Sequence, residues 1–172
     1  MNITLIGYRG TGKSVVGHIV AERLQMKCMG MDERIVEKAG MSIPEIVQKN
    51  GWPAFRDMES EVVRELATHD HIIIDTGGGV IERPENIEIL KTTSCIIWLK
   101  ASTNTIVSRI QGDTERPSLT GEKSFTEEVE EVLARRTPVY ASAAQYDIDT
   151  EQLTPEQVAD KIIEIWKSLG NL

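Results

Sequence analysis

The chain has 172 residues, of which 40% are hydrophobic and 27% are charged, and its formal net charge is −8. This length predicts one domain over residues 1–172 that buries a core without help from disulfides. The acidic balance, with no stripe of lysine and arginine, excludes nucleic acid as the main partner.

The sequence also predicts a compartment. No apolar run approaches the roughly 18 residues of a membrane span, and the chain does not begin with a basic stretch followed by an apolar segment. The two cysteines, Cys28 and Cys95, are too few for a disulfide framework or a zinc site, and their apolar surroundings predict buried thiols. We therefore expect no membrane association and a reducing, cytoplasmic location.

The first predicted elements are a strand at Ile3–Ile6 and a helix at Ser14–Leu24, which flank the segment GYRGTGKS at residues 7–14. That segment has the pattern G-x-x-x-x-G-K-[ST] of a phosphate-binding loop, in the order strand, loop, helix that such loops require. Its glycines let successive backbone N–H groups point toward a polyphosphate, and the start of the helix adds a positive dipole. The loop predicts nucleotide binding, with Lys13 reaching the outer phosphates and the Ser14 hydroxyl ligating Mg²⁺.

Strands and helices alternate along the rest of the chain. Apolar runs predict further strands at Cys28–Met31, Ile72–Ile74, Cys95–Leu99 and Tyr146–Ile148. Helical periodicity predicts helices at Pro53–Ala67, Thr103–Ile110, Thr126–Arg136 and Pro155–Leu169. This alternation predicts a three-layer α/β fold, a five-stranded parallel sheet with helices on both faces. The polar segment 111–124, with two glycines and a proline, predicts a mobile loop.

Several polar motifs follow the phosphate loop in chain order. They are Asp32 at the end of the second predicted strand, FRDME at 55–59, TGGG at 76–79, RPSL at 116–119 and RTPVY at 136–140. Each motif also has an ordinary interpretation without a function. The arginines could be solvated surface charges, the glycines could form a tight turn, and Asp32 could be a helix N-cap. Arg56, however, lies on the apolar side of its predicted helix, one turn before Glu59. A carboxylate three residues on can hold a guanidinium in one orientation.

In this order and spacing the motifs closely resemble those of the shikimate kinases, which are small P-loop kinases of the nucleoside monophosphate kinase type. The resemblance extends from residue 3 to about residue 165. It implies ATP-dependent phosphorylation of the 3-hydroxyl of shikimate to give shikimate 3-phosphate and ADP, with Mg²⁺ as cofactor, on the route to chorismate and the aromatic amino acids. We expect a monomer whose small-molecule partners are ATP and shikimate.

The resemblance also implies roles for individual residues. Asp32 orients or deprotonates the attacking hydroxyl, and Lys13 and Arg116 stabilise the transferring phosphoryl group. The segment at about 111–124 becomes a lid that carries Arg116, and the substrate-binding region spans about 32–60. The implied ATP-binding residues are Gly10, Thr11, Gly12, Lys13, Ser14, Val15, Arg109, Arg116 and Pro155.

The implied substrate-binding residues are Asp32, Arg56, Gly78, Gly79 and Arg136. Arg56 and Arg136 grip the shikimate carboxylate, with Glu59 bracing Arg56. Arginine suits this task better than lysine because its planar fork matches a carboxylate bidentately.

The chain departs from the family in its acidic residues. Most shikimate kinases carry D-x-D after the second strand, and Asp32 matches the second aspartate whereas Gly30 replaces the first, which helps hold the Mg²⁺ shell through water. Asp75, after an apolar strand, matches the Walker-B arrangement, and we predict that it joins Ser14 at the metal through water. The alternative is that Asp75 only caps the following turn. Ser118, where leucine is usual, is expected to matter little.

Two other functions compete with this interpretation. One is a related kinase for another hydroxy acid, such as gluconate. The other is a nucleotide-binding regulatory protein that has lost catalysis, for which Gly30 is the only support in the sequence. The presence of Arg56 and Arg136 together with Asp32 favours shikimate.

Overall fold

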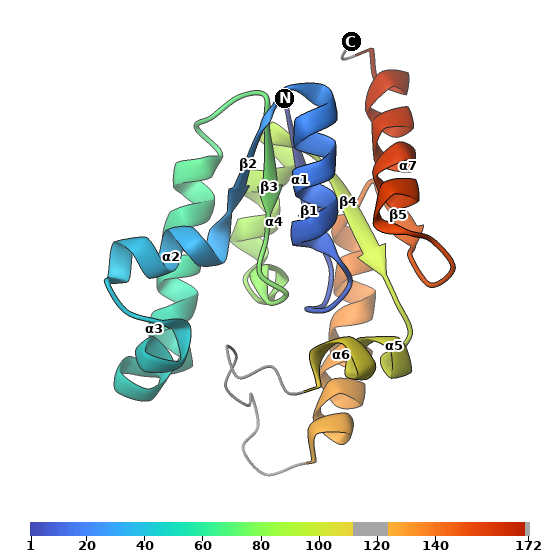
Figure 1. Ribbon diagram of the computed structural model, residues 1–172. Coiled ribbons are helices and arrows are strands. Elements are labelled where there is room, and N and C mark those ends of the chain that lie inside the picture. The colour runs from blue at the N-terminus through green and yellow to red at the C-terminus, as the bar shows by residue number, and fades with distance from the viewer. Residues whose placement is uncertain (112–123, 171–172) are drawn as a thin grey trace.

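The structure, a computed structural model, describes residues 1–111 and 124–170. A five-stranded parallel sheet of order β2-β3-β1-β4-β5 lies between two layers of helices (Figure 1). The strands are β1 (Asn2–Ile6), β2 (Lys27–Gly30), β3 (Ile72–Asp75), β4 (Ser94–Lys100) and β5 (Tyr146–Asp149). The helices are α1 (Lys13–Leu24), α2 (Met31–Ala39), α3 (Ile43–Leu66), α4 (Pro84–Thr93), α5 (Thr103–Ile110), α6 (Phe125–Ala143) and α7 (Pro155–Ser168). The predicted α/β fold is confirmed.

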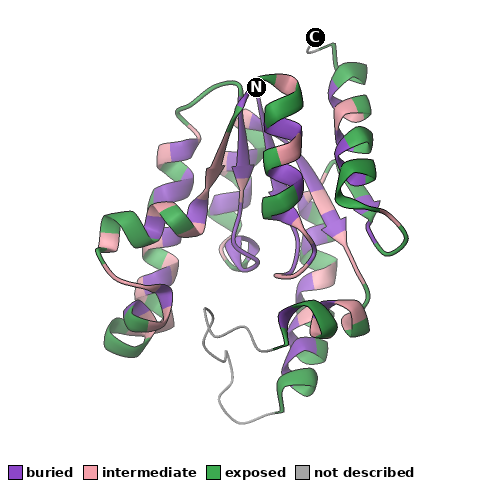
Figure 2. Cartoon of the chain, in the orientation of Figure 1, coloured by how far each residue is buried: buried purple, intermediate pink, exposed green. Residues whose placement is uncertain are grey.

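Both faces of the sheet are buried, which explains the uninterrupted apolar runs of the sequence. On one face, Ile3 and Leu5 of β1 pack with residues of α1 and α7, including Trp166. On the other, Ile6 packs with residues of α3, α4 and α6, including Phe55. Figure 2 shows the central strands buried and the outer faces of the helices exposed. The two cores hold the sheet rigid, so its carboxyl edge is a fixed platform for the loops.

The sequence prediction missed α2, α4 and the first part of α3. α3 is bent at Gly51 (φ 82°, ψ 169°), so the predicted helix at Pro53–Ala67 is its second part. Its first part begins with a capping box formed by Ser42 and Glu45. This signal is visible in the sequence, but the prediction of helices did not use it. α6 continues past its predicted end and through Pro138, because Tyr140 beyond it is fully buried against the core.

The predicted placement of Asp32 is wrong. β2 ends at Gly30, α2 begins at Met31, and Asp32 lies in the first turn of that helix. Gly30 is the N-cap residue, so Asp32 is not the cap either. The helix begins this early because Met31 and Ile35, one turn apart, are both buried in the core.

The cysteines partly match their prediction. Cys95 is buried and Cys28 half-buried, and both are free thiols. Burial raises the pKa of Cys28 to about 12, with the carboxylates of Asp75 and Glu33 adding to the effect, and burial raises that of Cys95 to about 11. Both thiols are therefore protonated at neutral pH. Within residues 1–111 and 124–170, no helix combines the length and the apolar character needed to cross a membrane.

Candidate active site

The phosphate loop leaves the central strand β1 at the carboxyl edge of the sheet, the edge at which ligands of open α/β sheets bind. Gly12 caps α1 with φ 93°, a left-handed conformation that favours glycine. The Nζ of buried Lys13 turns back and donates to the carbonyl oxygens of Gly7 (2.8 Å) and Tyr8 (3.1 Å). The Thr11 hydroxyl donates to the Tyr8 carbonyl as well (2.8 Å). These bonds hold the loop in its folded shape.

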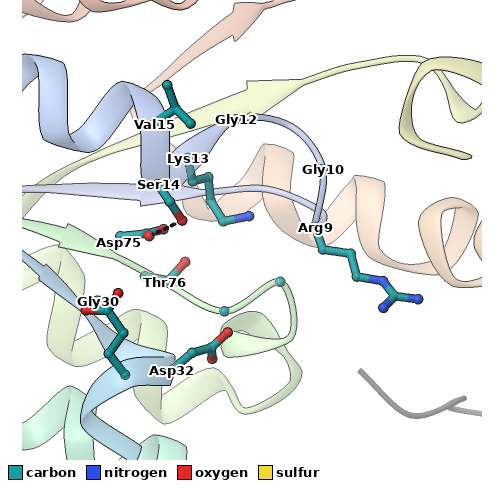
Figure 3. A pocket seen from close by; sticks show the side chains of 13 residues that line it. Arg9, Gly10, Gly12, Lys13, Ser14, Val15, Gly30, Asp32, Asp75 and Thr76 are labelled. Carbon is teal, nitrogen blue, oxygen red and sulfur yellow. Dashed lines mark hydrogen bonds between the residues drawn. The ribbon is translucent and has the colours of Figure 1, made fainter. Parts of the chain in front are cut away.

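A hollow of about 370 Å³ lies beside this loop (Figure 3). Its volume is within the range of small-molecule sites. The predicted site residues that line it are Gly10, Gly12, Lys13, Ser14, Val15, Asp32, Asp75 and Gly78. Asp32 lies across the hollow from Lys13 and Ser14, as Figure 3 shows. Arg9 and Glu33 line the hollow too, and the sequence analysis had assigned them no role.

Asp75 is directly bonded to the phosphate loop. The Ser14 hydroxyl donates to its Oδ2 at 2.5 Å (Figure 3). Burial raises the pKa of Asp75, an effect opposed by the charge of Lys13 and the bond from Ser14. Among hydrogen bonds between described residues, this carboxylate accepts from Ser14 and not from the turn that follows β3. The contact favours the Walker-B interpretation over the turn-capping one.

The donor set of the hollow fits Mg²⁺. A serine hydroxyl and the carboxylates of Asp32, Glu33 and Asp75 are hard oxygen groups of the kind this ion prefers. Among residues 1–111 and 124–170, no cluster of three or more His, Cys, Asp and Glu side chains is placed to hold a metal ion. The set therefore suits an ion that keeps water and nucleotide oxygens as most of its ligands.

Arg56 is held in one orientation by its own helix. Its Nη1 donates to Glu59 Oε1 at 2.7 Å, and Glu59 is only 1% exposed. The guanidinium carbon lies 5.4 Å from the ring centroid of Trp52 and 5.3 Å from that of Phe55, within cation–π range. The predicted contact between Arg56 and Glu59 is confirmed.

Arg136 is buried and is held by a carboxylate from a different element. Its Nε donates to Glu82 Oε1 at 2.7 Å, and Arg135 Nη2 reaches the same oxygen at 3.1 Å. Burial opposes ionisation of Glu82, but the two arginines keep its pKa below the ordinary value. Glu82 was not predicted, because a single glutamate in the short 3-10 helix Val80–Glu82 carries no sequence signal.

The glycine loop after β3 touches both arginines and leaves space for Arg56 at Gly79. A Cβ on Gly79 would lie 2.2 to 2.5 Å from guanidinium atoms of Arg56. A Cβ on Gly78 would lie 3.5 Å from Arg136 Nη1. The Tyr140 hydroxyl donates to the Gly78 carbonyl oxygen and ties α6 to the loop. The structure thus brings Arg56, Arg136 and the glycines together, although α3 and α6 are far apart in the chain.

The remaining predicted residues lie farther out. Arg109 Nη1 donates to the Gly10 carbonyl oxygen at 3.0 Å, so it contacts the phosphate loop but does not line the hollow. Pro155 begins α7 and also does not line it. Arg116, and the predicted lid apart from its end residues 111 and 124, lie outside the described residues.

The fold and the phosphate loop place the protein among the P-loop nucleotide-binding proteins. Arg56 and Arg136, each held by a carboxylate near the glycine loop, do not line the hollow beside the phosphate loop. Comparison with known proteins identifies the family within this class. The family model for shikimate kinase matches residues 9–167, and the chain belongs to this family. The resemblance inferred from the motifs is therefore confirmed.

Individual relatives agree with the family model. A shikimate kinase of Thermodesulfovibrio yellowstonii is 44% identical over 170 residues, which cover 99% of this chain and 97% of the relative. A shikimate kinase of Caldicellulosiruptor bescii is 34% identical over 164 residues, which cover 95% of this chain and 94% of the relative. The solved structure of a shikimate kinase from Acinetobacter baumannii in complex with shikimate has a TM-score of 0.92 and 33% identity, covering 97% of this chain and 93% of that one.

The contact between Gly79 and Arg56 yields a first prediction. Gly79→Ala should fold, because its Cβ meets only the guanidinium end of Arg56, which can move aside at the cost of its contact with Glu59. It should displace the Arg56 guanidinium and weaken shikimate binding by roughly tenfold or more, since a charged hydrogen bond is weakened. Titration calorimetry with shikimate measures the effect. In an Arg56→Ala background the same change should add little, and fully additive losses would contradict an effect through Arg56.

Proposed function

We propose that this protein transfers the γ-phosphoryl group of ATP to the 3-hydroxyl of shikimate, giving shikimate 3-phosphate and ADP on the route to chorismate and the aromatic amino acids. The observation that carries the proposal is the pair of arginines, each held by a carboxylate, beside the glycine loop and the phosphate loop. Membership of the shikimate kinase family and the likeness to a shikimate-bound structure support it.

In this proposal Arg56 and Arg136 hold the substrate carboxylate. Each guanidinium is already oriented, by Glu59 and by Glu82 respectively, so little side-chain freedom is lost when the substrate binds. A carboxylate gripped at two fixed points leaves the ring little freedom to rotate. This orients the ring hydroxyls toward the hollow and Asp32, and such positioning accounts for a large part of enzymatic rate enhancement.

Asp32 and Lys13 carry the proposed chemistry. Asp32 accepts a hydrogen bond from the attacking hydroxyl, orients it and takes its proton as the phosphoryl group is transferred. Lys13, at the start of α1, stabilises the negative charge on the transferring phosphoryl oxygens together with backbone N–H groups of the loop. Arg116, assigned from the family motif, is proposed to stabilise the same charge.

Ser14 and Asp75 are proposed to hold the metal ion that accompanies ATP. The Ser14 hydroxyl is the direct ligand, and the Asp75 carboxylate, already bonded to that hydroxyl, accepts hydrogen bonds from metal-bound water. When bound, Mg²⁺ neutralises negative charge on the β- and γ-phosphate oxygens.

A coupled assay of ADP release tests the function directly. We expect release that depends on shikimate and on Mg²⁺, and none above background with gluconate. Equal release with gluconate would identify a kinase for a different hydroxy acid. ATP binding with no turnover on either compound would instead indicate a regulatory nucleotide-binding protein.

Lys13→Ala tests the phosphate loop. Loss of one preorganised charge at the transferring group should lower kcat by on the order of 10²- to 10³-fold. Because Lys13 also bonds two loop carbonyls, melting temperatures should be compared alongside the rates. Lys27→Ala, at an exposed lysine of β2, is the control and should behave as wild type. Near-normal turnover of Lys13→Ala would overturn the loop assignment.

Arg56→Ala and Arg136→Ala separate substrate binding from nucleotide binding. Each should weaken shikimate binding by roughly 10- to 150-fold, the worth of a charged hydrogen bond. Affinity for ADP without shikimate should stay close to that of wild type. Arg135→Ala is the matched control, because Arg135 also contacts Glu82 but is largely exposed. If calorimetry finds that both variants bind shikimate normally, the carboxylate assignment is wrong.

Asp75→Ala tests the metal assignment. It should raise the Mg²⁺ concentration for half-maximal activity by roughly tenfold, as is usual for groups that act on a metal through its other ligands. The KM for shikimate, extrapolated to saturating Mg²⁺, should not change and serves as the internal control. An unchanged Mg²⁺ dependence would leave Asp75 with a purely structural contact to Ser14.

A further inference from the structure

Glu33 covers the place where Gly30 lacks a side chain. A Cβ built on Gly30 would lie 3.2 Å from Glu33 Oε2 and 3.3 Å from its carboxyl carbon. Position 30 ends β2 and is paired in register with Asp75 of β3. A carboxylate from the first turn of α2 therefore already lies where an aspartate at position 30 would project, next to Asp75.

The Glu33 carboxylate faces the phosphate-binding hollow and is available for binding. It lines the hollow together with Lys13, Ser14 and Asp75. Within residues 1–111 and 124–170, no hydrogen bond or ion pair engages this carboxylate, and the residue is exposed. Three carboxylates, those of Asp32, Glu33 and Asp75, thus face one small volume. The charges of Asp32 and Glu33 both act on Asp75, and such like charges oppose one another unless a cation lies nearby.

The two features at positions 30 and 33 depend on each other. With Glu33 in its present position, an aspartate at position 30 would crowd the glutamate carboxyl group, because even its Cβ would be closer than most such contacts. Glycine removes that crowding. The chain therefore has one carboxylate at this point, supplied by α2 instead of β2.

We propose that Glu33 does the work of the missing aspartate: its carboxylate, beside Asp75, would accept hydrogen bonds from water on the Mg²⁺ of the bound nucleotide. Glu33 is a positioning residue, since it reaches the metal through water and touches neither substrate nor phosphate. The inference rests on the proposed function only in that a Mg²⁺–nucleotide occupies the loop.

Mn²⁺ binding in the presence of ADP, measured by electron paramagnetic resonance and without shikimate, tests the proposal apart from catalysis. Glu33→Gln should weaken Mn²⁺ binding roughly tenfold. Calorimetry with ADP in EDTA should show unchanged or tighter binding, because a negative charge near the phosphates has been removed. Weaker metal binding without weaker binding of the metal-free nucleotide is specific to a metal-directed carboxylate.

Two further variants complete the test. Glu37→Gln makes the same change on the same helix, at a side chain that is 70% exposed and pairs with Arg34, and should leave Mn²⁺ binding unchanged. The exchange Gly30→Asp with Glu33→Ala returns the carboxylate to β2 and should restore most of the lost affinity.

Each outcome has a distinct meaning. If wild type binds Mn²⁺ and ADP but Glu33→Gln binds them equally well and only melts earlier, Glu33 merely stabilises the start of α2 and the proposal is overturned. Failure of the exchange variant to recover the affinity lost in Glu33→Gln would overturn it as well. If wild type itself binds no ADP, the proposed function fails instead.

Discussion

One row of paired residues across the sheet determines where the site forms. Asp75 is in register with Leu5 of β1 on one side and with Gly30 of β2 on the other. The buried Thr76 hydroxyl then donates to the Leu5 carbonyl oxygen at 2.8 Å, locking the end of β3 to β1. Because all the strands run in parallel, the phosphate loop, the glycine loop and the start of α2 leave the same edge from adjacent strands. Every proposed role depends on this alignment.

The two arginines of the site are stabilised by carboxylates of the protein itself. Guanidinium groups lose hydration when they are partly buried, which is unfavourable unless a carboxylate and hydrogen bonds replace the water. Glu59 and Glu82 supply that carboxylate for Arg56 and Arg136, and Gly79 leaves the space for Arg56. Each arginine retains further donors for a ligand, since a guanidinium has five N–H groups. The two guanidinium groups are therefore held in fixed orientations before any ligand binds.

The hollow beside the phosphate loop is lined by acidic as well as basic side chains. Asp32 and Glu33 of α2 and Asp75 of β3 line it together with Lys13 at the start of α1. Figure 3 shows Asp32 across the hollow from Lys13. Together these three carboxylates repel a triphosphate without a metal ion and attract a triphosphate that carries a divalent ion. Under the proposed function, this arrangement favours the metal-loaded nucleotide in the hollow and leaves Arg56 and Arg136, beyond the glycine loop, for the second substrate.

Local residue patterns were enough to predict the α/β class, the parallel sheet, the phosphate loop and the bracing of Arg56 by Glu59. Each of these depends on neighbours within a few residues: the alternation of apolar runs, the loop motif, and a pair one helical turn apart. The family resemblance added Arg136 and the glycines to the site. The Walker-B pattern predicted that Asp75 lies near Ser14, but not their direct hydrogen bond. Local patterns do not predict contacts between distant segments, so the contacts of Glu82 with Arg136 and of Glu33 with Gly30 were visible only in the packed chain. Asp32 was misplaced for a related reason: burial of Met31 and Ile35 against the core, a tertiary effect, made the helix begin one residue after the strand ended.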